Sequence, residues 1–87
     1  MGSFRVEWKP STKRDLRQIA PDQVARIVEA VAGLAAEPRP NGSQKLHGGE
    51  HAYRIRIGDY RAVYLVSDAF FTVTVLRVRH RKDVYRT

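Results

Sequence analysis

Arginines recur at short intervals through the second half of the sequence, and a histidine stands among them. The residues able to do chemistry are Arg54, Arg56, Arg61, Arg77, Arg79, His80, Arg81 and Tyr85, preceded by His47, Glu50 and His51. A guanidinium binds phosphate oxygens through a planar fork of N–H donors and stays charged at any ordinary pH. His80 is the best suited of the set to exchange protons near neutral pH, because an unperturbed imidazole has a pKa of about 6.5. The set suits a ligand rich in phosphate.

Metal chemistry fits the same residues poorly. The sequence has no cysteine, so thiolate ligands are excluded. Its three histidines lack the spacing and the carboxylate pattern of a zinc site. We therefore expect neither a metal site nor another cofactor.

The charge of the chain points to an anionic partner. The 87 residues carry a net charge of +7, and 12 of the 16 basic residues are arginine. Residues 44–87 hold 9 basic and 4 acidic side chains, against 7 and 5 in residues 1–43. Nucleic acid is the favoured partner class for such a surface, while an anionic membrane or an acidic protein stays open.

The stretch from Tyr53 to Val66 predicts the element that presents these arginines. Two alternating runs joined by Gly58-Asp59 are typical of a β-hairpin. Side chains in a strand alternate between the two faces of a sheet, so the first run has one apolar face and one face with Arg54 and Arg56. After Arg61 the second run is almost continuously apolar, as in a strand buried on both faces in mid-sheet. The turn should therefore bring Arg61 close to Arg56.

The rest of the chain predicts two helices and two further strands. Phe4 to Lys9 alternates strictly and predicts a first strand, and a short helix anchored by Leu16 and Ile19 follows. A second helix begins near Pro21, where apolar residues start to recur at spacings of three and four. These apolar residues are Val24, Ile27, Val28, Val31 and Leu34. Phe70 to Val78, rich in β-branched and aromatic residues, predicts the last strand.

These elements predict a single α+β domain over residues 1–87, in the order β-α-α-β-β-β. Two N-terminal helices would pack on one face of a four-stranded, mostly antiparallel sheet and leave the other face to the arginines. The sequence does not fix the neighbour of the first strand. Because it has no apolar run of signal-peptide or membrane-spanning length, we expect a cytoplasmic protein without a membrane partner.

The hairpin and the C-terminal segment resemble the RelE family of bacterial toxins, part of the RelE/ParE superfamily. The matching segments are Tyr53 to Arg56, Gly58 to Tyr64 and Val78 to Tyr85. The order of elements agrees, as do Leu34 to Pro38 before a glycine loop and Lys45-Leu46 before the hairpin. The resemblance extends over essentially the whole chain.

This resemblance implies a RelE-like fold and the toxin of a type II toxin-antitoxin system. Members of the RelE type are ribosome-dependent endoribonucleases that cleave mRNA in the decoding site and so inhibit translation. Cleavage proceeds without a metal, by attack of the ribose 2′-hydroxyl on the adjacent phosphate. An acidic cognate antitoxin wraps the toxin, and the operon's DNA is contacted only through that antitoxin. The implied partners are the antitoxin, the ribosome and mRNA.

The resemblance also implies roles for individual residues. Arg61 and Arg81 match the arginines that family members place on the scissile phosphate, and Tyr85 matches a tail tyrosine that stacks on the substrate base. Arg54 and Arg56 fall where several members have a pair of lysines or arginines. The basic side chains expected to bind RNA phosphates are Lys45, Arg54, Arg56, Arg77 and Arg79.

Arginine in place of lysine changes the expected proton chemistry. With a pKa above about 12, Arg54 and Arg56 bind phosphate but cannot act as bases. His80 is then the first candidate for the base, since neighbouring arginines would lower its pKa and keep it neutral. Glu50 and Tyr85 are the next candidates.

Two other functions stay open at this point. A ParE-like toxin would share the fold but inhibit DNA gyrase, and the combination of Arg61, Arg81 and Tyr85 argues against it. A non-catalytic module could use the same basic face to bind RNA or an acidic antitoxin without breaking a bond.

Overall fold

Five strands and two α-helices make up the described part of the chain, residues 3–82 of a computed structural model. In chain order the elements are β1 (Arg5–Trp8), α1 (Pro10–Arg17), α2 (Pro21–Ala32), the 3₁₀ helix η1 (Gly33–Ala35), β2 (Gln44–Lys45), β3 (Ala52–Ile57), β4 (Tyr60–Ser67) and β5 (Thr72–His80). The expected α+β architecture is confirmed. Within residues 3–82, none of the helices combines the length and the apolar character needed to cross a membrane.

The strands form one mixed sheet in the order β1-β5-β4-β3-β2. β1 runs parallel to β5, which answers the question of its neighbour, and the other pairs are antiparallel. The sheet has one strand more than the four expected, because Gln44 and Lys45 pair with Arg54 and Tyr53. Two residues are too few to show an alternating pattern in a sequence, so β2 could not be predicted from periodicity.

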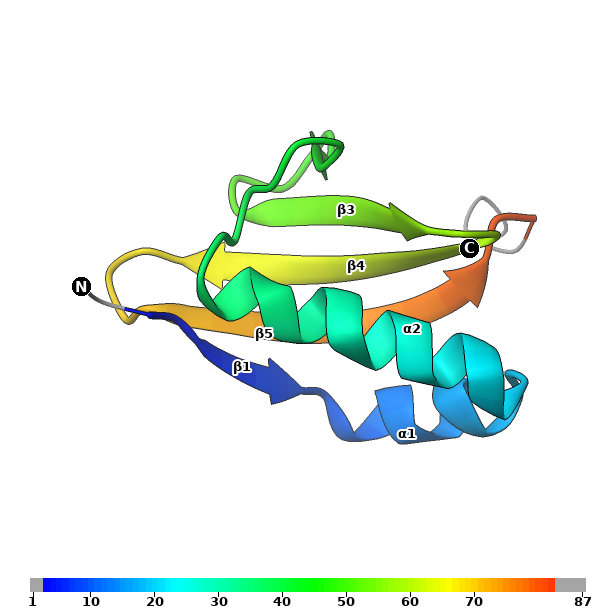
Figure 1. The fold of residues 1–87 in the computed structure, drawn as a ribbon. Coiled ribbons are helices and arrows are strands. Elements are labelled where there is room, and N and C mark those ends of the chain that lie inside the picture. The colour runs from blue at the N-terminus through cyan, green and yellow to red at the C-terminus, as the bar shows by residue number, and fades with distance from the viewer. Residues whose placement is uncertain (1–2, 83–87) are drawn as a thin grey trace.

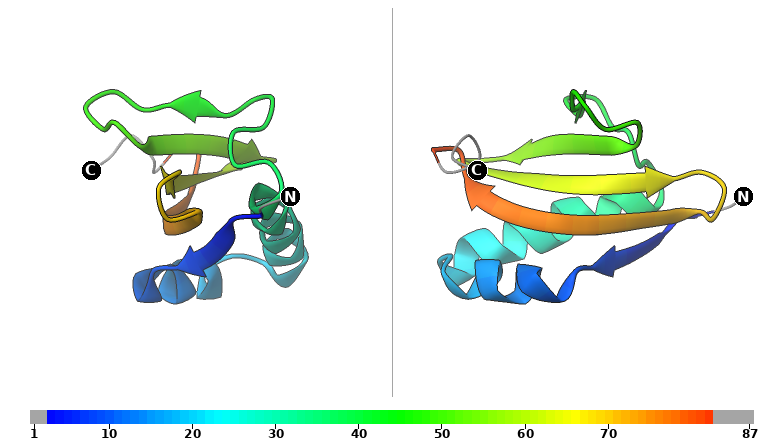
Figure 2. Two further views of the ribbon diagram at one scale, coloured as in Figure 1. Left: turned by 90° about the vertical axis from the view of Figure 1, so that its left-hand side faces the viewer. Right: turned by 180° about the vertical axis from the view of Figure 1, so that it is seen from behind.

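The helices leave one face of the central strands uncovered by any described element. Helix α2 crosses one face of the sheet, and α1 lies against β5 beyond the end of β1 (Figure 1). The view from behind shows β3, β4 and β5 in front of α2, with α1 below β5 (Figure 2, right). We call this uncovered side of β3, β4 and β5 the open face and the other the helix face.

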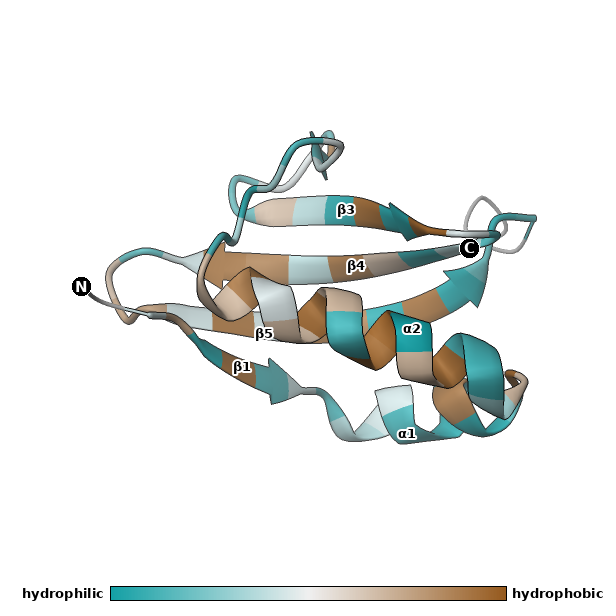
Figure 3. Ribbon diagram, viewed as in Figure 1, coloured by the Kyte–Doolittle hydropathy of each residue, from teal (hydrophilic) through white to brown (hydrophobic). Residues whose placement is uncertain are grey.

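The hydrophobic core lies between α2 and the helix face. Figure 3 shows the apolar stripe of α2 and the alternation of hydrophobic and hydrophilic residues along β3. The stripe predicted for α2 is buried at Ile27 and Val31, but Val28 is 43% exposed, because it lies to one side of the contact with the sheet. Burial of each such aliphatic side chain stabilises the fold by about 1.5 to 3 kcal/mol.

A β-bulge interrupts the pairing of β4 with β5. Tyr64 pairs with Val75 and the adjacent Val63 pairs with Arg77, so Leu76 is the extra residue. An extra residue reverses the alternation that follows it. Val75 and Val78 consequently both face the core, although they are three residues apart, and Arg77 is directed to the open face.

Candidate phosphate-binding site

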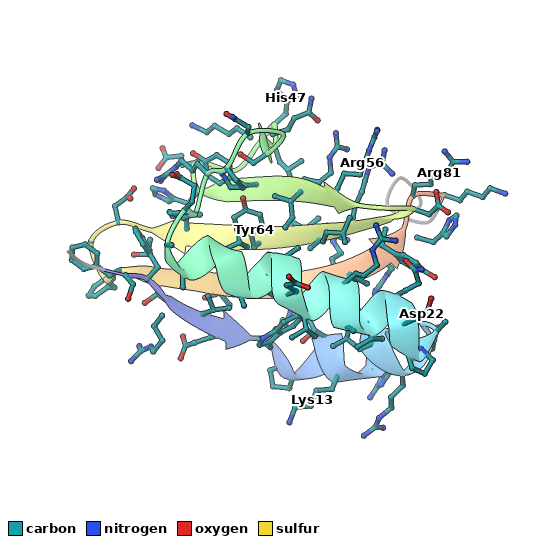
Figure 4. The ribbon with its side chains drawn as sticks, in the orientation of Figure 1. Lys13, Asp22, His47, Arg56, Tyr64 and Arg81 are labelled. Atoms are coloured by element: carbon teal, nitrogen blue, oxygen red, sulfur yellow. The ribbon has the colours of Figure 1, made fainter. Side chains whose placement is uncertain are left out.

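The β3–β4 turn fixes one end of the open face. Ile57 pairs with Tyr60, so Gly58 and Asp59 form a two-residue turn, as predicted. Gly58 has a φ of 61°, a conformation that glycine adopts without a steric penalty. The backbone N–H of Arg81 donates to the carbonyl of Asp59 at 2.7 Å. This bond ties the chain after β5 to the turn, and Figure 4 shows Arg56 and Arg81 at the same end of the sheet.

A first row of arginines crosses the open face near this turn. Arg56 on β3 pairs with Arg61 on β4, which pairs with Arg79 on β5. Cross-strand partners lie on the same face with Cβ atoms about 5 Å apart. The predicted proximity of Arg56 and Arg61 is therefore confirmed, and Arg79 joins them. Arg56 is exposed, whereas Arg61 is only 7% exposed and so is held more firmly.

Arg79 is joined to the helical layer as well as to the row. Its guanidinium forms an ion pair with Asp15 on α1, and the other oxygen of that carboxylate accepts a hydrogen bond from the Val78 N–H at 3.1 Å. The Asp15 side chain is only 12% exposed. Asp15 therefore both caps the edge of β5 and offsets the charge of Arg79.

A second row lies next to the first, farther from the turn. Arg54 on β3 pairs with Val63 on β4, which pairs with Arg77 on β5. Val63 is 3% exposed and sits between the two arginines. Arg54 donates a hydrogen bond to the side-chain oxygen of Gln44 on β2, a contact that orients the guanidinium and adds no negative charge. Below, the first arginine row is Arg56, Arg61 and Arg79, and the second is Arg54 and Arg77.

A groove of about 660 Å³ adjoins both rows along the outer side of β3. It is lined by Arg54, Arg56 and Arg61, by Ile55 and Ile57, by Ala30 and by residues 40–44. Its wall is cationic on the side of the arginines, so the groove extends the surface on which an anion can be bound.

The loop of residues 37–43 that lines this groove is fastened to the sheet by a small polar cluster. Arg39 donates two hydrogen bonds to Asp68, at 2.7 and 3.2 Å, and one to the Tyr53 hydroxyl at 3.0 Å. The hydrogen bond from Arg39 lowers the pKa of Asp68 below its ordinary value, and the same bond raises the pKa of Arg39. Next to this cluster, the buried Tyr64 hydroxyl donates to the Pro38 carbonyl at 2.8 Å, and burial raises the pKa of Tyr64.

His80 lies on the opposite side of the sheet from the arginine rows. It pairs with Tyr60, which packs against the core, and the two rings meet edge to face at 5.4 Å. Its Nδ1 accepts a hydrogen bond from the Lys82 N–H at 3.3 Å. A separate cavity of about 400 Å³ beside α1 includes His80, Tyr60 and Asp15 in its lining. The structure therefore does not bring the imidazole together with Arg61.

Of three further sequence candidates, two lie apart from the first row and the third falls outside the described residues. Lys45 pairs with Tyr53 and so shares the helix face, and Tyr85 lies outside the described residues. Glu50 precedes β3 and contacts His51 at 3.8 Å. Glu50 thus lies before the start of β3, whereas Arg56 is the last residue but one of that strand.

Two parts of the site were missed by sequence reasoning. Asp15 carried no signal because it is 64 residues away from Arg79, and a single carboxylate on a short helix is usually a solvated residue. Arg39 and Asp68 lie 29 residues apart on two loops, and neither belongs to a repeating pattern. Both contacts depend on tertiary structure.

Comparison with known proteins links this fold to one class of toxins. A family model described as "ParE toxin of type II toxin-antitoxin system, parDE" matches residues 6–85. "Toxin RelG" of Mycobacterium tuberculosis is 34% identical over 84 residues, which cover 95% of this chain and 97% of that protein. "Toxin RelE" of the same organism is 30% identical over 84 residues, covering 95% of this chain and 87% of that protein.

Solved structures of toxin-antitoxin complexes contain similar chains. In the RelBE2 toxin-antitoxin complex of Mycobacterium tuberculosis the matching chain has a TM-score of 0.79 and 33% identity, with 91% of this chain and 99% of that chain covered. In the archaeal RelE-RelB complex of Pyrococcus horikoshii OT3 the TM-score is 0.81 and the identity 27%, with coverage of 91% and 96%.

Proposed function

The chain belongs to the RelE/ParE family of toxins of type II toxin-antitoxin systems, and we propose that it is an endoribonuclease that cleaves mRNA in the ribosomal decoding site. The observation that carries this proposal is the first arginine row, with Arg81 held at the same turn. The similarity to proteins named RelG and RelE supports the ribonuclease over other activities of the family.

The proposed chemistry is attack of a ribose 2′-hydroxyl on the adjacent phosphate, which forms a 2′,3′-cyclic phosphate and breaks the bond from phosphorus to the 5′-oxygen of the next nucleotide. The 2′-hydroxyl gives up its proton, and the departing 5′-oxygen takes one up. Negative charge builds on the non-bridging oxygens in the transition state, and prearranged cations stabilise it best where water is excluded. Arg61 suits this task because it is 7% exposed and fixed within the sheet. Residues 3–82 contain no group of three or more His, Cys, Asp or Glu side chains placed to hold a metal. In this proposal the guanidiniums neutralise the phosphate.

Each arginine near the turn has a distinct role in the proposal. Arg61 contacts the scissile phosphate in the transition state, and Arg81 approaches it from the segment tied to Asp59. Arg56, which is exposed, draws the RNA onto the face and shares its charge. Arg79 is a positioning residue, since its ion pair with Asp15 holds it toward α1.

His80 was predicted as the base, but its ring lies with Tyr60 on the helix face. This position favours a mechanism in which substrate orientation and arginine electrostatics supply most of the rate. Tyr85, proposed to stack on the substrate base, is outside the described residues.

The proposed regulatory partner is an acidic antitoxin that covers the arginine rows. The RelBE2 and RelE-RelB structures contain similar chains in toxin-antitoxin complexes. Charge complementarity would make association fast and sensitive to salt. If the neighbouring gene product bound equally well at all salt concentrations and left the Arg61 surface exposed, this mode of binding would be wrong.

Inhibition of DNA gyrase is the second candidate, favoured by the description of the matching family model as a ParE toxin. The two functions separate cleanly in vitro. The purified chain should arrest translation in a reconstituted system with cleavage of the message at the ribosome, and should leave supercoiling by purified gyrase unchanged. Arrested supercoiling with intact message would reverse the assignment.

A further inference from the structure

We propose that the second arginine row, Arg54 and Arg77, is a subsite for the phosphate adjacent to the one held by the first row. This inference rests on the proposed function, because it takes RNA as the ligand of the open face. It assigns to Arg77 the positioning of the RNA strand, whereas Arg61 acts on the scissile phosphate.

The spacing of the two rows fits successive phosphates. On β3 and β5 the arginines of the two rows are two residues apart, Arg54 from Arg56 and Arg77 from Arg79. With a rise of about 3.3 Å per residue, the rows are about 7 Å apart. This separation is comparable to that of neighbouring phosphates along an extended RNA strand. A strand lying along β4 would therefore present one phosphate to each row.

The composition of the second row suits a single phosphate. Its central position is Val63, flanked by Arg54 and Arg77. The flanking strands are two strand spacings apart, about 10 Å, a distance that two arginine side chains can bridge from opposite sides. Arg54 is oriented by Gln44, and Arg77 stands beside the buried Val63. The two guanidiniums can thus bracket an anion above an apolar residue.

The bulge at Leu76 is the structural device that creates this subsite. Val73 and Val75 face the core, so uninterrupted alternation would direct residue 77 to the core as well. The register shift instead directs Arg77 and Arg79 to the open face and Val78 to the core. Bulges are common beside active sites, where they redirect a side chain. Here the bulge keeps the core apolar while it adds cations to the open face.

Binding of two short RNAs by the full chain tests the subsite. The ligands are a dinucleoside monophosphate and a trinucleoside diphosphate, both with 2′-O-methyl sugars so that neither can be cleaved. Affinities are measured by NMR titration, which also verifies that each variant is folded. The parent should bind the longer ligand about tenfold more tightly, the gain expected for one additional charge-assisted contact.

Substitution at Arg77 should remove that gain. We expect Arg77→Gln to bind both RNAs with similar affinity, and Arg77→Lys, which keeps the charge, to retain most of the difference. Arg17→Gln, an exposed residue on α1 with the same change in charge, is the control and should retain the full gain. Salt dependence gives a second measure of the same contact. For the parent, the slope of log K against log salt should be steeper by about 0.7 for the trinucleoside diphosphate than for the dinucleoside monophosphate. For Arg77→Gln the two slopes should be equal.

Three outcomes decide the question. If Arg77→Gln loses the tighter binding of the longer RNA while Arg17→Gln keeps it, the subsite is supported. This holds even if no cleavage is seen on ribosomes and the nuclease assignment is wrong. A full gain in Arg77→Gln overturns the subsite, and so does a parent that shows no gain, even if Arg61-dependent cleavage is observed. The binding assay thus tests the subsite, and the cleavage assay tests the nuclease function, independently of each other.

Discussion

The two faces of β3, β4 and β5 are built from alternate residues of the same strands, yet they have opposite effects on the stability of the fold. On the helix face, Tyr64 and Val75 are fully buried and contribute to the core. On the open face, Arg56, Arg61 and Arg79 stand side by side. Like charges on neighbouring strands destabilise a sheet. Most of the free energy of folding therefore comes from the helix face, whereas the arginine rows, which we propose to bind anions, oppose folding.

The largest effect on stability should come from truncation of a core side chain. Ile27→Ala removes a fully buried side chain between α2 and the sheet and should lower the free energy of unfolding by about 2 to 5 kcal/mol. Val28→Ala on the same helix, where the side chain is 43% exposed, should cost much less. Urea unfolding of both variants measures the difference. Equal losses would mean that the core does not lie where we describe it.

Asp15 should have an intermediate effect, because it links α1 to the β5 edge and to Arg79. Asp15→Ala removes the ion pair and the acceptor for the Val78 N–H, with an expected loss of about 1 to 3 kcal/mol. Asp15→Asn keeps an oxygen for that N–H and should lose less. Were both variants as stable as the parent in urea, Arg79 would have to be reassigned from positioning to direct contact with RNA.

His80 should contribute little to the cleavage rate. A base that takes the proton directly is worth typically 10² to 10⁴ in rate. Because the ring packs on Tyr60 on the helix face, we expect His80→Gln to slow single-turnover cleavage on programmed ribosomes by less than about tenfold. If His80→Gln instead slowed cleavage by about 10² to 10⁴, the substrate would have to contact the imidazole on the helix face.

The smallest effect should be the pH dependence due to Asp68. Its pKa is lowered in the folded state by the hydrogen bond from Arg39, so the carboxylate stabilises the fold above its unfolded pKa of about 3.9. That contribution is lost as the pH falls through the lower folded pKa. Asp68→Asn should therefore have a slightly lower urea midpoint than the parent at pH 6.5, and this difference should become smaller as the pH is lowered below about 3.9. A difference that did not become smaller at low pH would assign the effect to packing.

The local features of the fold could be predicted from the sequence. Alternation in residues 53–66 and the Gly58-Asp59 pair define the hairpin, and they bring Arg61 to Arg56 because only two residues separate the strands. The spacing of apolar residues likewise predicted α2. In each case the signal and the structure lie within one stretch of chain.

The features that were not predicted depend on distant contacts. β1 pairs with β5, and the paired residues, such as Arg5 and Thr72, are far apart in the sequence. The bulge at Leu76 depends on how β5 fits against β4 and the core. The strand from Phe70 to Val78 was predicted two residues early at each end, since Phe70 and Phe71 belong to the turn and are exposed. The sequence predicted that His80 lies among the arginines, because it stands between Arg79 and Arg81. The pairing of β5 with β4 instead directs His80 to the helix face, opposite Tyr60.

Single-turnover cleavage of mRNA on programmed ribosomes by Arg61→Gln, with Arg17→Gln as the control of equal charge, tests the role of the open face most directly. We expect Arg61→Gln to cleave at least about 100-fold more slowly, while its urea midpoint is unchanged or higher. Arg17→Gln should cleave like the parent. Cleavage by Arg61→Gln at the parent rate, or a loss of cleavage that only follows a loss of folded protein, would contradict the claim that the open face is the active surface.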